Sequence, residues 1–275
     1  YKTLNAKDFI VLRLTGRFCT EPSDATSNSC IDLRTLQWSE TIVRASGIDG
    51  EKLPEIVPST CVAGGVTKWA AEQTGLAEGT PVVMGGGDGL CSNVGAGSVR
   101  PGRTFSCIGS SAWIATTSEQ PLFDEEMRTF TWAHIVPGLY SPTGTMQSAG
   151  SAYHWLKQQI AHWETAEGAR LQCSPYDLIN AEAAKSPIGS RGVTFLPYLL
   201  GERAPRWNPD ATAAWLGVKM ENERCDLFRA VLEGITLNLN IILDVLRQSE
   251  PIDELLLIGG GAKGAVWRQI LADVY

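Results

Sequence analysis

The sequence is poor in the features that mark secreted, metal-binding and membrane proteins. Its seven cysteines are scattered, odd in number and form no CxxC pair, which favours reduced thiols in a cytoplasmic protein over a disulfide framework. The three histidines, His134, His154 and His162, lack metal-ligand spacing, so we expect no metal site made by side chains. No apolar run approaches the ~18 residues of a membrane span, and no secretory signal pattern begins the chain.

Basic charge is also scarce. The chain has 30 acidic and 23 basic side chains, a formal net charge of −7, which disfavours nucleic acid as a partner. Hydrophobic residues make up 44% of its 275 residues, enough for a packed core, so disorder is excluded. Because the chain begins with Tyr1 and ends in a helix-like pattern without a glycine or proline stop, we expect both ends to lie inside a longer protein.

Strand-like and helix-like patterns alternate along the chain, which is typical of an α/β fold. The clearest helix is expected at residues 226–247, where an apolar stripe repeats with a period near 3.6 residues. A hairpin is expected from the runs 104–108 and 112–117, which the short turn 109–111 joins. Residues 8–15 fit a helix or a strand, because their periodicity is too brief to decide.

Shorter patterns predict the remaining elements. Further strands are expected at residues 81–84, 129–135, 138–141, 192–199 and 255–258. The first of these strands is apolar throughout, so we expect it to be buried. Further helices are expected at residues 39–46, 66–74, 90–97 and 149–163, and after residue 262. A change of composition near residues 99–102 predicts a domain boundary, with domains at 1–99 and 100–275.

A run of three glycines followed by Asp88 ends the strand expected at 81–84. Glycines allow the backbone to approach a ligand closely, and ligands bind at the carboxyl ends of strands in open α/β sheets. A single carboxylate at that place suits a general base that takes a proton from a hydroxyl. It equally suits a cap of the following helix, and the local pattern favours neither role.

Two further glycine-containing turns are candidates for binding phosphate or nucleotide. The turn Gly109-Ser110-Ser111 offers small residues and backbone amides that suit a phosphate, although an ordinary hairpin turn is the simpler interpretation. After the strand at 255–258, Gly259, Gly261 and Gly264 form a GxGxxG pattern before a helix. That is the context of a dinucleotide-binding fingerprint, so an NAD-binding oxidoreductase is one alternative. A broader interpretation is that the glycine turn lets a nucleotide of any kind lie against the start of the helix.

Some conspicuous residues are better explained by structure than by chemistry. Glu202 and Arg203 follow the strand expected at 192–199 and could pair to fix a loop, but a plain structural turn is favoured. Trp155, Trp215 and Trp267 lie in apolar patterns, which indicates core positions rather than ligand platforms.

Taken together and in order, these segments resemble the FGGY carbohydrate kinases, especially xylulokinase-like members. The resemblance rests on residues 13–39, 81–88, 109–111, 195–205 and 259–273. It implies an α/β, actin/hexokinase-like fold of two ribonuclease H-like domains, here truncated at both ends, with the active site in the cleft between them. On this basis residues 1–99 are the C-terminal part of the first, sugar-binding domain, and 100–275 an incomplete nucleotide-binding domain.

The resemblance also assigns roles to individual residues. Asp88 would be the base that activates a sugar hydroxyl toward the γ-phosphate of ATP, with Mg²⁺ as the companion of ATP. Gly89 would lie beside the sugar. Residues that would contact the nucleotide are Gly109, Ser110, Gly150, His154, Gly260, Gly261 and Ala262. The partners implied are a small sugar and ATP, and a homodimer is a family expectation.

The sequence departs from the family at three places. Gly89 stands where xylulokinases usually have asparagine, so gluconate or another aldonate or polyol competes with D-xylulose, our first choice of substrate. Gly264 stands where the second family signature normally has serine. The N-terminal Asp-x-Gly-Thr phosphate loop is absent from this stretch, so we expect the stretch alone to be inactive. A non-catalytic sugar or nucleotide sensor is the remaining alternative.

Overall fold

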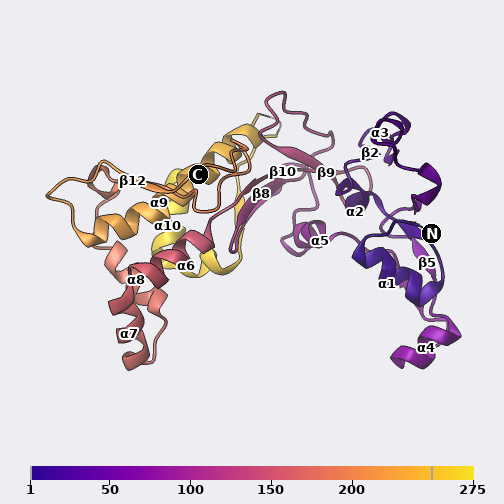
Figure 1. Cartoon of the computed structure of the whole chain (residues 1–275), viewed down its shortest axis with the longest axis horizontal. Coiled ribbons are helices and arrows are strands. Elements are labelled where there is room, and N and C mark those ends of the chain that lie inside the picture. Colours follow the sequence, from indigo (N-terminus) through magenta and orange to yellow (C-terminus); the bar gives the residue numbers. More distant parts are fainter. Residues whose placement is uncertain (1, 249) are drawn as a thin grey trace. The chain divides into compact units, whose positions relative to one another are not determined.

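The computed structural model describes residues 2–248 and 250–275, which divide into two compact units (Figure 1). Unit 1 contains Tyr1–Arg103, Thr117–Leu122 and Thr131–Pro142. Unit 2 contains Thr104–Thr116, Phe123–Phe130 and Thr143–Tyr275. Within the described residues, no helix combines the length and the apolar character that crossing a membrane requires.

Unit 1 is built from short helices and two-stranded ladders. Its helices are α1 (Ala6–Thr15), α2 (Pro22–Thr26), α3 (Glu40–Ser46), η1 (Gly50–Lys52), α4 (Lys68–Thr74) and α5 (Asp88–Gly95). Its ladders are β1 (Cys19–Thr20) with β4 (Glu55–Ile56), β2 (Ile31–Asp32) with β3 (Gln37–Trp38), and β5 (Val62–Gly65) with β6 (Pro81–Val83). The ambiguous segment 8–15 is helical, because the Asp8 carboxylate accepts the Asn5 amide at the helix start and Gly16 ends the helix in the left-handed region.

The core of unit 1 lies between α1 and the strands. It consists of Val11, Cys19, Val57, Ala63 and Met84, which are all at most 6% exposed. The expectation that strand 81–84 is buried was wrong for most of its length, since Val83 is 53% exposed. The reason is that β6 pairs with β5 alone, in a two-stranded sheet, so that side chains on its open face meet solvent.

The sheet of unit 2 contains the predicted hairpin. Strands β7 (Thr104–Ile108) and β8 (Ala112–Thr116) are antiparallel, with Ile108 opposite Ala112. Strand β13 (Leu255–Ile258) pairs with β7 in parallel, and residues 143–146 of β10 (Tyr140–Met146) pair with β8. Strand β9 (Phe130–Ala133) precedes β10 in the chain. Because β7 and β13 are parallel neighbours, the turns that follow them leave the sheet at the same edge.

Helices and a small ladder complete unit 2. They are α6 (Gly150–Gln159), α7 (His162–Leu171), α8 (Pro175–Ala183), η2 (Ser190–Gly192), β11 (Thr194–Leu196) with β12 (Ala214–Leu216), α9 (Arg224–Leu246), η3 (Gly260–Lys263) and α10 (Ala265–Val274). The single helix expected at 149–163 is two helices. Its backbone leaves the helical region at residues 160–161, where both amides bond to the carbonyl of Leu156.

Helix α9 forms the core of unit 2, as its apolar stripe predicted. Leu232, Ile235, Leu239 and Ile242 on that stripe are fully buried. Trp267 of α10 is buried as expected and donates its indole N–H to Thr236 Oγ1 of α9 at 3.0 Å. Burial of such large side chains contributes about 1.5–3 kcal/mol each, so α9 is the element on which α10 and the sheet depend.

Asp226, in the first turn of α9, links the stability of unit 2 to pH. The carboxylate is fully buried; it accepts hydrogen bonds from the Ser186 hydroxyl at 2.6 Å, the Glu223 amide at 2.9 Å and Arg191 at 3.0 Å. Burial by itself raises the pKa of Asp226, but these hydrogen bonds outweigh it and lower the pKa from 3.8 to about 2. A lowered folded-state pKa means stability that is present above the ordinary pKa and is lost as the pH falls through 2.

We therefore expect the free energy of unfolding to fall more steeply between pH 4 and pH 2 in the wild type than in Asp226→Asn. The reason is that residue 226 takes up a proton in this range when it is aspartate but not when it is asparagine. Urea unfolding at a series of pH values measures the difference. Asp210→Asn is the matched control, because Asp210 is exposed and should leave the slope unchanged. If the free energy of unfolding fell equally with pH in the wild type and in Asp226→Asn, the lowered pKa of Asp226 would be contradicted.

Candidate functional site

The structure divides the predicted site residues between the two units. Asp88 and Gly89 belong to unit 1. Unit 2 holds the predicted nucleotide contacts, which are Gly109, Ser110, Gly150, His154, Gly260, Gly261 and Ala262. The two sets are therefore built by different folding units, each with its own supporting contacts.

Asp88 is presented to solvent at the start of α5. Gly85 has a φ of +72°, which favours glycine, and a Cβ at Gly86 would lie 2.4 Å from Ile135 Cδ1. Gly87, not Asp88, occupies the N-cap position of α5, so the helix-capping alternative for Asp88 is not what the structure shows. The carboxylate is exposed and its Oδ1 accepts the amide of Gly89 at 2.8 Å. It is accessible to a ligand at the end of a closely packed glycine run.

The turn at residues 109–111 is fixed by the start of α6. The carbonyl of Gly109 accepts the Gly150 amide at 2.9 Å, and the carbonyl of Ser110 accepts the amides of Ala149 and Ser151 at 3.0 and 2.9 Å. Helix starts normally leave such amides without an intrahelical partner, so the turn and the helix satisfy one another. Close approach requires glycine, because a Cβ at Gly150 would lie 2.2 Å from the Gly109 oxygen.

This arrangement leaves the amides of the turn itself available. In the part of the chain that the structure describes, neither Ser110 nor Ser111 donates its amide to a protein acceptor. Two successive amides in a tight turn suit a phosphate group. Among the described residues, the buried hydroxyl of Ser151 on the first turn of α6 also has no partner. His154, one helical turn after Gly150, is exposed and its Nδ1 lies 2.9 Å from the Tyr176 hydroxyl.

The second glycine turn lies against the first strand of the hairpin. Gly259 has a φ of +88°, and a Cβ there would lie 2.5 Å from the Ile108 oxygen. A Cβ at Gly261 would lie 2.5 Å from Ile108 Cγ2, whereas one at Gly260 would meet open space. Ile108 directly precedes Gly109, so both glycine turns lie at one sheet edge within unit 2. The two turns, which contain Gly109, Ser110, Gly260, Gly261 and Ala262, thus both adjoin Ile108, and such a pair of turns beside helix starts suits a nucleotide.

Glu202 connects the segment before α6 to helix α9. The side chain is 5% exposed, and its carboxylate accepts the amides of Gln147 and Arg203 and the side-chain amide of Asn238, each at 2.8 Å. Burial raises the pKa of Glu202, and these hydrogen bonds oppose the rise. Among the described contacts Glu202 bonds to the backbone amide of Arg203 and makes no ion pair with its side chain, which agrees with the structural-turn interpretation. Its hold on Gln147 fixes the segment that leads into α6.

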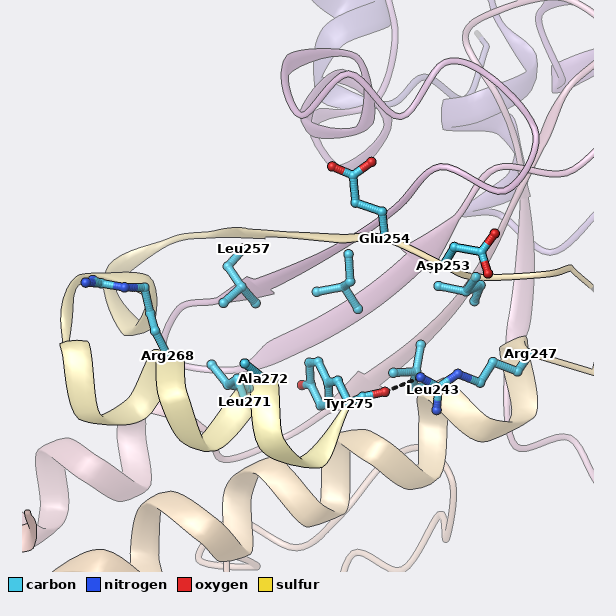
Figure 2. Close-up of a pocket in the computed structure, with 11 residues that line it drawn as sticks. Leu243, Arg247, Asp253, Glu254, Leu257, Arg268, Leu271, Ala272 and Tyr275 are labelled. Atoms are coloured by element: carbon cyan, nitrogen blue, oxygen red, sulfur yellow. Dashed lines mark hydrogen bonds between the residues drawn. The ribbon is translucent and has the colours of Figure 1, made fainter.

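A pocket of about 360 Å³ lies elsewhere in unit 2, between β13, α10 and the end of α9 (Figure 2). Leu257, Arg268, Leu271 and Leu243 line it, and Arg247 donates a hydrogen bond to the carbonyl of Tyr275 at its rim. None of the predicted nucleotide contacts lines this pocket. It is therefore separate from the candidate site.

Sequence reasoning missed the residues that hold the glycine run of Asp88. The amide of Gly85 bonds to the carbonyl of Ser59 at 3.0 Å, and the amide of Gly87 bonds to the Ser23 hydroxyl at 3.0 Å. Both serines in turn donate to the buried carboxylate of Glu21. The sequence around Glu21 carried no signal of a link to Asp88, because the network joins residues that lie far apart in the chain.

Comparison with known proteins decides the family. Residues 105–275 match the FGGY family of carbohydrate kinases, C-terminal domain, and residues 1–95 match the N-terminal domain of that family. The chain belongs to the FGGY carbohydrate kinases. The resemblance found in the sequence and the actin-like α/β fold that it implied are thus confirmed.

Curated relatives carry two substrate names. The chain is 32% identical over 280 residues to a gluconokinase of Bacillus subtilis, covering 100% of this chain and 54% of that protein. It is 30% identical over 276 residues to a xylulose kinase of Staphylococcus xylosus, covering 100% and 55%. The chain therefore spans about half the length of the curated relatives that it matches.

Solved structures that match the chain carry the same two kinds of name. A xylulose kinase from Rhodospirillum rubrum matches with a TM-score of 0.88 at 32% identity, covering 99% of this chain and 53% of that one. A gluconate kinase from Lactobacillus acidophilus matches with a TM-score of 0.89 at 27% identity, covering 99% and 54%. These relatives are kinases, so the oxidoreductase interpretation of the GxGxxG pattern loses its support.

Proposed function

We propose that the protein transfers the γ-phosphoryl group of ATP to a hydroxyl of a small sugar or polyol, with Asp88 as the general base. The observation that carries the proposal is the pair of glycine turns at one sheet edge of unit 2, with the Ser110 and Ser111 amides available to an anion. In this proposal Gly109 and Ser110 bind phosphate, Gly260, Gly261 and Ala262 line the adenosine pocket, and Gly150 and His154 border the nucleotide.

In the chemical step Asp88 takes the proton of the acceptor hydroxyl as its oxygen attacks the γ-phosphorus. A bond from that oxygen to phosphorus forms while the bond to the leaving ADP oxygen breaks. The exposure of the Asp88 carboxylate and the close packing of the glycine run before it support this role. The amides of Ser110 and Ser111 would stabilise phosphate charge, which is the main source of catalysis in phosphoryl transfer.

Mg²⁺ would enter with the nucleotide. Among residues 2–248 and 250–275, no three histidine, cysteine or acidic side chains lie close enough together to hold a metal ion. Mg²⁺ typically keeps several waters and binds through substrate phosphates and one or two carboxylates. In this proposal the phosphate oxygens of ATP would be the principal ligands of Mg²⁺, and charge neutralisation would be the chemistry that the ion supplies.

D-Xylulose is our first choice of acceptor, and D-gluconate or another aldonate or polyol is the second. A Cβ at Gly89 would meet open space, so the position beside Asp88 offers room but no side-chain hydrogen bond. The gluconokinase and xylulose kinase relatives stand at 32% and 30% identity, which supports both substrates. We extend the proposal to a sugar-binding domain at 1–99, a nucleotide-binding domain at 100–275, a cytoplasmic location and a homodimer.

The substrate is tested by ADP release from Mg-ATP in the full protein, with D-xylulose, L-xylulose, D-ribulose, D-gluconate, glycerol and L-fuculose as acceptors. Turnover on a ketopentose supports the first choice, and turnover on D-gluconate supports the second. Nucleotide binding without turnover on any acceptor would instead indicate a sensor.

Gly89→Asn is expected to raise the ratio of kcat/KM for D-xylulose over that for D-gluconate by about tenfold, because one added hydrogen bond discriminates on that scale. Steady-state kinetics with both acceptors measure the ratio. Gly95→Ala is the control, since it lies on the same helix and its Cβ would also meet open space. An unchanged ratio in Gly89→Asn would place residue 89 away from the acceptor.

A further inference from the structure

Glu21 is a buried carboxylate with every oxygen engaged. It is fully buried, and its Oε1 accepts the Ser23 hydroxyl at 2.7 Å and the Asp24 amide at 2.8 Å. Its Oε2 accepts the Ser23 amide at 2.8 Å and the Ser59 hydroxyl at 2.7 Å. Lys7 Nζ lies 3.7 Å from Oε1. A buried charge is costly unless it is hydrogen-bonded throughout. Breaking any of these four hydrogen bonds is therefore unfavourable, and the groups that donate them are held in place along with Glu21.

Two of those donors hold the glycine run that leads to Asp88. The Ser23 hydroxyl donates a hydrogen bond to Glu21 and therefore turns a lone pair toward the Gly87 amide, which donates to it at 3.0 Å. The Ser59 hydroxyl donates a hydrogen bond to the same carboxylate, while the Ser59 carbonyl accepts one from the Gly85 amide at 3.0 Å. Ser23 and Ser59 are 1% and 4% exposed, so water does not compete freely for these bonds.

Capping of α2 explains only part of this geometry. The Glu21 carboxylate accepts the Ser23 and Asp24 amides at the start of that five-residue helix. Two bonds of the network lie outside the cap: the Ser59 hydroxyl donates to Glu21, 38 positions away, and the Gly87 amide donates to the Ser23 hydroxyl, 64 positions away. The carboxylate thus connects three chain segments, and the third ends at Asp88.

We propose that Glu21 is a positioning residue for Asp88, acting through Ser23 and Ser59 on the amides of Gly87 and Gly85. The proposal rests on the proposed role of Asp88 as the base. Charge-assisted hydrogen bonds are stronger than neutral ones, so a buried carboxylate at the centre of the network fixes the backbone just before the base more firmly than an amide would.

The test compares Ser23→Ala and Glu21→Gln with Asp8→Asn as the matched control. Asp8 is also a buried acid of unit 1, is 1% exposed, and bonds to Lys7 and to the Asn5 amide rather than to the glycine run. Hydrogen exchange of the Gly85 and Gly87 amides is measured first. We expect Ser23→Ala to speed exchange at Gly87, and Glu21→Gln to speed exchange at both Gly85 and Gly87, each by about tenfold, the loss of one net hydrogen bond. Asp8→Asn should leave both exchange rates unchanged.

Kinetics then separate positioning from plain stability. We expect Ser23→Ala to lower kcat by about 10²-fold, the cost of a small misplacement of a catalytic group, while KM for ATP stays within about twofold of the wild-type value. In the Asp88→Asn background the same change should cost no further kcat, because the base is already gone. Ser23→Ala keeps the test valid if Glu21→Gln does not fold.

Two results would overturn the proposal. One is unchanged exchange at Gly85 and Gly87 in a folded Glu21→Gln protein, or at Gly87 in Ser23→Ala if Glu21→Gln does not fold. The other is an equal loss of kcat from Ser23→Ala with and without Asp88. If the wild type phosphorylates no acceptor, the proposed function fails, while the exchange measurement still decides whether Glu21 holds the glycine run.

Discussion

Asp88→Asn is expected to lower kcat by about 10²- to 10⁴-fold, the range that a general base contributes. The amide keeps the shape of the side chain but does not take the proton of the acceptor hydroxyl. Nucleotide affinity is expected to stay within about twofold of the wild-type value, because the candidate nucleotide contacts belong to unit 2 and Asp88 to unit 1.

Steady-state turnover and calorimetric titration with Mg-ADP measure these two quantities. Glu40→Gln is the matched control, because Glu40 is also an exposed carboxylate at the first position of a helix in unit 1. It should leave both quantities unchanged. An Asp88→Asn protein with wild-type turnover would remove Asp88 from the chemistry.

Gly150→Ala is expected to weaken Mg-ADP binding by about tenfold or more, which corresponds to the 1–3 kcal/mol cost of overpacking. The added Cβ would lie 2.2 Å from the Gly109 oxygen and 3.1 Å from its carbonyl carbon. Both neighbours are backbone atoms, so the turn at 109–111 has to move away from α6. That movement displaces the Ser110 and Ser111 amides proposed to bind phosphate.

Calorimetric titration with Mg-ADP, together with urea unfolding, distinguishes a displaced turn from general instability. Gln158→Ala is the control, because it lies on an exposed position of the same helix. It should change neither affinity nor stability much. Wild-type affinity in a folded Gly150→Ala protein would show that the contact between α6 and the turn does not shape the nucleotide site.

The sequence predicted those elements whose signals are local. Helix α9 follows from its apolar period, and the β7–β8 hairpin follows from two short strands around a small-residue turn. The break at residues 160–161 carried no such signal, because neither residue is a glycine or a proline. The exposure of Val83 depends on which strand pairs with β6, and pairing between distant segments is not written in local periodicity.

The candidate site shows the same limit. Asp88 and the two glycine turns were found because glycine runs and their order in the family are visible in sequence. The contacts that support them were not, since they join Gly150 to Gly109, Gly259 to Ile108, and Glu21 to Ser59 and Ser23. A buried carboxylate such as Glu21 or Glu202 looks like any surface acid until its donors are known.

The most direct test of the account is an amide NMR titration of the protein with Mg-ADP, with NAD in a parallel sample. We expect Mg-ADP to shift the Ser110, Ser111, Gly260, Gly261 and Ala262 amides with a single dissociation constant, and NAD to leave them essentially unchanged. Shifts confined to other residues, or a response to NAD alone, would contradict a kinase nucleotide site at the paired glycine turns.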